Sequence, residues 1–84
     1  MLKGICLTVP SDERILETIQ VFVESLGAAV GVAEDELTDM SIAVMELVRN
    51  GMKHGNSMDP AKPLIVRADV LPGRMSFQVE DRGS

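Results

Sequence analysis

The period of the apolar residues constrains the fold of this chain more than any other feature of the sequence. Apolar and polar residues alternate over positions 5–9, as in a strand with one buried face. Apolar residues then recur at helical spacing over 15–26 and again over 37–51, which predicts two amphipathic helices. Alternation returns over 64–81 on both sides of Pro72-Gly73, a pair that suits a type II turn, so this region predicts a β-hairpin. The order strand, helix, helix, strand, strand indicates an α+β two-layer sandwich, with two helices on one face of a mostly antiparallel sheet.

Capping residues predict where the helices begin and end. Ser11, directly after a proline, is the expected N-cap of the first helix, and Gly27 is expected to end it. Three acidic residues at 34–36 suit the positive end of the second helix. Gly55 is the expected C′ residue of that helix, and residues 55–63 have the composition of a loop.

Composition narrows the functional classes. At 84 residues the chain is one domain at most. A net charge of -5 and the absence of Trp and Tyr argue against nucleic-acid binding, which needs basic surface and aromatic stacking platforms. No apolar run approaches the roughly 20 residues of a membrane span, and the N-terminus does not resemble a signal peptide. Because Cys6 is the only cysteine, no internal disulfide can form, and we interpret it as a small buried hydrophobe in a cytoplasmic protein.

The polar face of the second predicted helix carries an unusual set of side chains. At 100° per residue, Glu46, Asn50 and Lys53 fall along one side, opposite the apolar stripe. A solvated helix face would account for the charges but not for Asn50 beside Gly51, since both residues disfavour a helix interior. A carboxylate can activate a hydroxyl, a carboxamide oxygen suits Mg²⁺, and a lysine can neutralise phosphate. Gly51 would let another element approach closely, so the pattern favours a phosphate-handling site.

A second polar motif stands at the end of the hairpin, in the sequence VEDRGS. Asp81 follows the last alternating strand and is separated from Gly83 by one residue. A simple turn explains this arrangement. The alternative is a carboxylate that accepts a hydrogen bond from an exocyclic amine, with Gly83 allowing close approach of the backbone.

Together the segments ELVRNGMKHGN (46–56) and EDRGS (80–84) resemble the GHKL ATPase/kinase superfamily, whose domain is the Bergerat fold. The first segment is similar to its N-box, Glu-x-x-x-Asn followed by Lys-His-Gly. The second supplies the first four positions of its Asp-x-Gly-x-Gly motif. The short first strand and the compact two-helix start most resemble the bacterial anti-sigma-factor serine/threonine kinases, which bind a sigma factor and use ATP to phosphorylate an anti-anti-sigma protein.

The resemblance implies a role for each residue of the two motifs. Glu46 would be the general base, Asn50 the Mg²⁺ ligand and Asp81 the carboxylate that reads adenine. The remaining residues would line the nucleotide site: Lys53, His54 and Gly83. The implied cofactors are ATP and Mg²⁺, and the implied partners are a sigma factor and an anti-anti-sigma protein.

The resemblance covers only the N-terminal part of the family domain. The sequence stops at Ser84, before the second glycine of the motif, and lacks the family's ATP lid, later glycine-rich box and final strands. We therefore expect residues 1–84 to form a single, incomplete histidine-kinase-like ATPase domain that does not turn over ATP as given. The last strand would remain an open edge with an apolar inner row, which predicts a homodimer.

Two other functions fit the same residues. One is the ATPase domain of a two-component histidine kinase, which would require a phospho-accepting helix ahead of the first residue. The other is a non-catalytic interaction module that binds a partner through the two-helix face. Nucleotide binding would distinguish the kinase from the interaction module.

Overall fold

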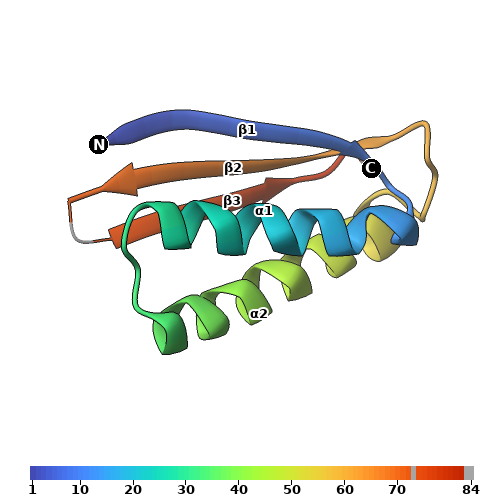
Figure 1. The fold of residues 1–84 in the computed structure, drawn as a ribbon. Coiled ribbons are helices and arrows are strands. Elements are labelled where there is room, and N and C mark those ends of the chain that lie inside the picture. Colours follow the sequence, from blue (N-terminus) through green and yellow to red (C-terminus); the bar gives the residue numbers. More distant parts are fainter. Residues whose placement is uncertain (73, 83–84) are drawn as a thin grey trace.

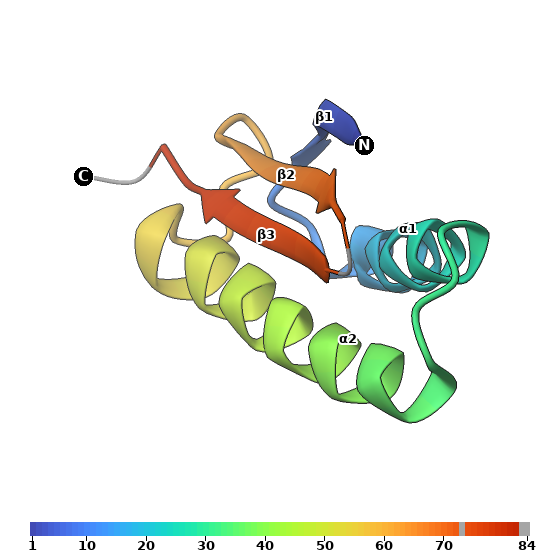
Figure 2. The ribbon, with the colours of Figure 1, turned by 90° about the vertical axis from the view of Figure 1, so that its left-hand side faces the viewer.

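Two layers, a three-stranded sheet and a pair of helices, make up the computed structural model, which describes residues 1–72 and 74–82 (Figure 1). The predicted α+β architecture is confirmed, since both helices lie against the same face of an antiparallel sheet (Figure 2). The elements in chain order are β1 (Leu2–Pro10), the 3₁₀ turn η1 (Glu13–Ile15), α1 (Leu16–Ala29), α2 (Glu34–Asn50), the π-helical turn η2 (Gly51–Gly55), β2 (Pro63–Leu71) and β3 (Arg74–Glu80).

The sheet has the order β1-β2-β3, and both pairs of neighbours are antiparallel. Central strand β2 pairs with β1 through Leu7↔Val66 and with β3 through Val66↔Val79. The ladder between β2 and β3 confirms the predicted hairpin. Its expected type II turn includes Gly73, which lies outside the described residues.

The core lies between the inner face of the sheet and the facing sides of α1 and α2. Because side chains alternate along a strand, one row of β2 is buried throughout. The core is aliphatic and methionine-rich, as the scarcity of aromatic residues predicts; its fully buried members are Ile19, Val23, Val48, Met52, Leu64 and Val66. No helix of the described residues is long and apolar enough to cross a bilayer.

Both predicted boundaries of the first helical segment are wrong. The N-cap is Asp12, whose carboxylate accepts a hydrogen bond of 2.9 Å from the backbone N–H of Arg14, whereas Ser11 is buried and donates to the carbonyl oxygen of Lys62, just before β2. Gly27 does not end the helix either: α1 continues to Ala29, and a Cβ on Gly27 would collide with the side chain of Leu37. The glycine therefore serves the close packing of α1 on α2.

Two apolar residues lie at the surface, contrary to the predicted core. Cys6 is exposed, because the helices cover only one face of the sheet and the side chain points to the other. Leu47 belongs to the apolar spacing over 37–51 that predicts the second helix, but it is 51% exposed. The last turns of α2 contribute Val44 and Val48 to the core instead, and η2 contributes Met52.

Candidate functional site

The second helix does not end in the predicted way but widens into a π-helical turn. The backbone N–H of Asn56 donates to the carbonyl oxygen of Gly51 at 2.8 Å, a bond to the fifth residue back. The left-handed conformation expected at Gly55 is found instead at Ser57 and Met58, each with φ 53°. Single π-turns in α-helices occur frequently at functional sites. This one lies directly after Asn50.

Gly51 allows the sheet to approach the helix, as the sequence predicted. A Cβ at this position would stand 2.7 Å from Cδ1 of the fully buried Leu64 and 3.7 Å from Cγ1 of Val79. Contacts below 3.0 Å cannot be accommodated unless a neighbour moves. The glycine therefore brings the end of α2 onto the central strand and beside the end of β3.

Gly55 makes room for Asp81, a role that the sequence did not reveal. A Cβ on Gly55 would overlap the Asp81 carboxyl group, with its Oδ1 at 2.7 Å. The carboxylate thus lies against the backbone of the π-turn. The two residues are far apart in sequence, and only the docking of β3 beside the helix brings them together.

These elements enclose an open hollow of about 780 Å³ between the end of α2, the π-turn and the end of β3. Its polar groups are a carboxamide, an imidazole, a hydroxyl, an ammonium and a carboxylate, and two aliphatic side chains complete the wall. The lining residues are Leu47, Asn50, Gly51, His54, Gly55, Ser57, Lys62, Val79 and Asp81. Groups of this chemistry can bind a ligand that combines phosphate with a partly apolar, hydrogen-bonding moiety.

The structure brings together three of the predicted site residues: Asn50, His54 and Asp81. Glu46 is exposed and lines a different depression, between α1 and α2. Lys53 also lines another hollow, beside Leu16 and Met52. Gly83 lies outside the described residues.

Lys62 and Asn56 were missed in the sequence because they stand in a segment that predicts only a loop. The loop folds back, so that Lys62 reaches the rim of the hollow and the Asn56 side chain enters the protein interior. A buried asparagine two residues after the Lys-His pair has no periodic signal in the sequence. Its presence directly after a helix could have indicated only a cap.

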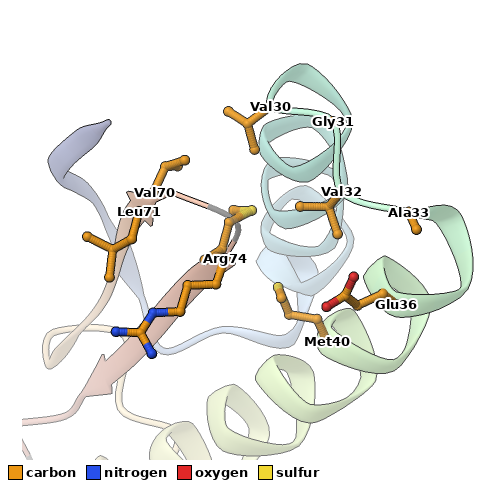
Figure 3. Close-up of a pocket in the computed structure, with 10 residues that line it drawn as sticks. Val30, Gly31, Val32, Ala33, Glu36, Met40, Val70, Leu71 and Arg74 are labelled. Carbon is orange, nitrogen blue, oxygen red and sulfur yellow. The ribbon is translucent and has the colours of Figure 1, made fainter.

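A second hollow, of about 270 Å³, opens at the other end of the molecule (Figure 3). Val32 and Met40 on the helical side and Val70 and Leu71 of the hairpin contribute apolar surface to it. It contains none of the predicted site residues. We therefore assign the candidate site to the larger hollow around Asn50.

The fold and this site define a class of protein, and comparison with known families agrees with it. The family model of the histidine kinase-like ATPase domain matches residues 9–84, so the chain belongs to that family. This confirms the resemblance to the GHKL superfamily.

Among curated proteins, the chain is similar to anti-sigma F factors of three Clostridium perfringens strains, SM101, ATCC 13124 and 13. Each is 33% identical over 66 residues, which covers 79% of this chain and 44% of the relative. The chain therefore spans less than half of the length of these relatives.

Proposed function

We propose that this chain forms the nucleotide-binding part of an anti-sigma factor with ATP-dependent serine/threonine protein kinase activity. The whole protein would bind a sigma factor and phosphorylate an anti-anti-sigma protein. The ATPase family implies ATP and Mg²⁺ in general, and the relatives named above are anti-sigma factors. The observation that carries the proposal is the hollow in which Asn50, His54 and Asp81 meet.

The end of the hollow at Asp81 suits an adenine base. The carboxylate can accept a hydrogen bond from the exocyclic amine of adenine, and such charge-assisted bonds are about twice as strong as neutral ones. Leu47 and Val79 offer the apolar surface that a planar base requires. Because Leu47 is half exposed on this wall, a bound base would cover apolar area that water now contacts.

The other polar groups that line the hollow, Asn50, His54 and Lys62, suit phosphate and a cation. No group of three His, Cys, Asp or Glu side chains within residues 1–72 and 74–82 could hold a metal ion. A Mg²⁺ ion would thus depend on Asn50 and on phosphate oxygens, and this cation commonly binds through one or two protein ligands and a substrate. Lys62 and His54 would neutralise phosphate charge, and the metal would supply electrostatic stabilisation during transfer.

Glu46 would orient and activate the hydroxyl of the acceptor protein. It stands one turn before Asn50 on α2, and exposure leaves its carboxylate open to an incoming chain. Lys53, on the opposite side of the same helix end, would meet phosphate only through a change in its side-chain direction.

The separation of Glu46 from the hollow favours a second candidate, a nucleotide-binding interaction module without phosphoryl transfer. The two candidates differ in one measurable property. The kinase transfers phosphate to a serine or threonine of its partner, whereas the module binds nucleotide and partner only.

Isothermal titration of the natural protein that carries these residues with Mg-ATP tests the nucleotide site. Asp81→Asn should weaken binding by about 10- to 100-fold, the value of a hydrogen bond to a charged group. Asn50→Ala should remove the dependence of binding on Mg²⁺ and leave the fold intact. Glu80→Gln is the matched control, because Glu80 pairs with Arg67 at 3.3 Å and does not line the hollow. Equal affinities for wild type and Asp81→Asn would refute the site.

A further inference from the structure

Asn56 is the most completely bonded side chain of the protein interior among the described residues. It is 0% exposed, and its Nδ2 donates to Ser11 Oγ at 2.9 Å and to the carbonyl oxygen of Pro63 at 3.1 Å. Its Oδ1 accepts from the backbone N–H of Arg82 at 2.6 Å. The carbonyls and the N–H fix the orientation of the amide, because only Nδ2 can donate and only Oδ1 can accept.

This network joins four segments that are remote in sequence. Ser11 follows β1, Asn56 follows the π-turn, Pro63 begins β2 and Arg82 follows β3. Ser11 strengthens the link, since it is fully buried and donates to the carbonyl oxygen of Lys62 at 2.7 Å. Buried polar groups that are fully satisfied hold their surroundings in a single arrangement.

The bond to Arg82 replaces the sheet ladder at the point where the ladder ends. The last described pair of β2 and β3 is Ile65↔Glu80, so Asp81 and Arg82 lie beyond it. The Arg82 N–H belongs to the peptide group that starts at Asp81, and Asn56 is covalently attached to Gly55. The same asparagine therefore holds both sides of the contact between the Gly55 backbone and the Asp81 carboxylate.

We propose that Asn56 is a positioning residue for Asp81, and that it sets the preference of the nucleotide site for adenine over guanine. The inference rests on the proposed function. Guanine presents a carbonyl where adenine presents the amine, and a site built to bond an N–H group rejects an analogue that lacks it. That rejection depends on a carboxylate held in one place, and Asn56 is what holds it.

The test measures the ratio of the dissociation constants of Mg-GTP and Mg-ATP for the natural protein that carries these residues. Arg82→Pro removes the donor N–H while Asn56 stays in place, but the proline also restricts the backbone of Asp81, so its effect is compared with that of Asn56→Ala. Asn56→Ala removes the acceptor from the other side. Arg82→Ala is the matched control, since it keeps the N–H and deletes only an exposed side chain.

We expect the ratio to fall by about 10-fold or more in Arg82→Pro and Asn56→Ala and to stay at the wild-type value in Arg82→Ala. A merely structural role would weaken both nucleotides equally and leave the ratio unchanged. In the Asp81→Asn background, Arg82→Pro should change the ratio no further, because the group it positions is already gone. Hydrogen exchange adds a readout without nucleotide: the Arg82 amide should exchange faster in Asn56→Ala.

The outcomes separate the inference from the proposed function. A wild-type ratio in Arg82→Pro would overturn the role of Asn56 and leave the adenine site standing. A wild-type protein that binds both nucleotides equally, or neither, would overturn the proposed function and this inference with it. If Asn56→Ala does not fold, a wild-type ratio in Arg82→Pro still overturns the inference, because that variant lacks the bond to Asn56.

Discussion

Gly51 and Gly55 stand four residues apart in one helical turn, yet alanine at the two positions should have opposite effects. Neither glycine has a positive φ, so alanine is compatible with both backbones and gains about 1 kcal/mol of helix propensity. The difference comes from what each new Cβ would meet. At Gly51 it meets Leu64, which is buried, and at Gly55 it meets the exposed carboxylate of Asp81.

The magnitudes follow from the freedom of these two neighbours. Leu64 is 0% exposed and packed between the helices and the sheet, so a contact at 2.7 Å forces overpacking that costs about 1–3 kcal/mol. Less the propensity gain, Gly51→Ala should destabilise the fold by up to about 2 kcal/mol. The Asp81 side chain is exposed, so a new Cβ at Gly55 would displace it from its wild-type position without overpacking the core, and Gly55→Ala should be neutral or stabilising by up to about 1 kcal/mol.

Thermal and urea unfolding measure both changes, and 1 kcal/mol corresponds to about 4–8 °C in Tm for a domain of this size. Titration with Mg-ATP is an independent measurement. Gly55→Ala should bind Mg-ATP more weakly without losing stability, because the new Cβ displaces the Asp81 carboxylate. A Gly51→Ala protein as stable as wild type would show that the close approach of Leu64 to the helix is not as described. Strong destabilisation by Gly55→Ala would show that the Asp81 side chain cannot move away from a new Cβ at position 55.

Further predictions concern catalysis, acid stability and association. Glu46→Gln should keep ATP binding and slow phosphoryl transfer in the whole protein, and a wild-type rate of transfer to the partner would exclude Glu46 as the base. The hydrogen bonds from Arg14 lower the pKa of Asp12 from 3.8 to about 2, so the stabilisation is present above pH ~4 and is lost as the pH falls towards ~2. Asp12→Asn should therefore reduce the pH dependence of Tm between pH ~4 and ~2. A variant whose Tm falls with pH as steeply as that of the wild type in this range would contradict the prediction. The 84-residue chain by itself should bind ATP with a dissociation constant above ~1 μM, because an open hollow makes too few contacts to offset the entropy lost when the ligand is ordered. A sub-micromolar dissociation constant measured by titration would refute this. Since β3 is an edge of the described sheet, light scattering at ~0.1 mM should give about twice the chain mass, and a monomer would refute edge pairing.

Periodicity predicted the order and type of every main element, because burial of one face dictates period 2 in the strands and helical spacing in the helices. The prediction failed where a residue that is typical of a helix end instead packs against a residue distant in sequence. Gly27 and Gly55 carry the signal of a helix end, but Leu37 and Asp81 explain them better, and neither contact is readable from spacing.

The candidate site was predictable in part for the same reason. Asn50 and His54 share one helix face, and Asp81 follows the strand that docks beside it, so chemistry and order placed them together. Lys53 was misplaced because the hollow lies on the side of the helix where Leu47, Gly51 and His54 flank Asn50, whereas Lys53 and Glu46 line other depressions. Asn56 was missed because its four bonding segments come together only in three dimensions.

The hollow has walls from two separate stretches of chain, the helical segment that ends at Gly55 and the hairpin that ends at Asp81. Contacts between such stretches form late in folding and break early in unfolding, because closing them costs more loop entropy than forming contacts between residues that are close in sequence. Fraying of β3 would remove Val79 and Asp81 from the site and leave the helices largely in place. A nucleotide bound there would act as a clamp between the two stretches, and its affinity would add directly to the free energy that keeps the hairpin docked. If the site binds nucleotide as proposed, occupancy and docking of the last strand would be coupled, and hydrogen exchange of the β3 amides would slow as nucleotide binds.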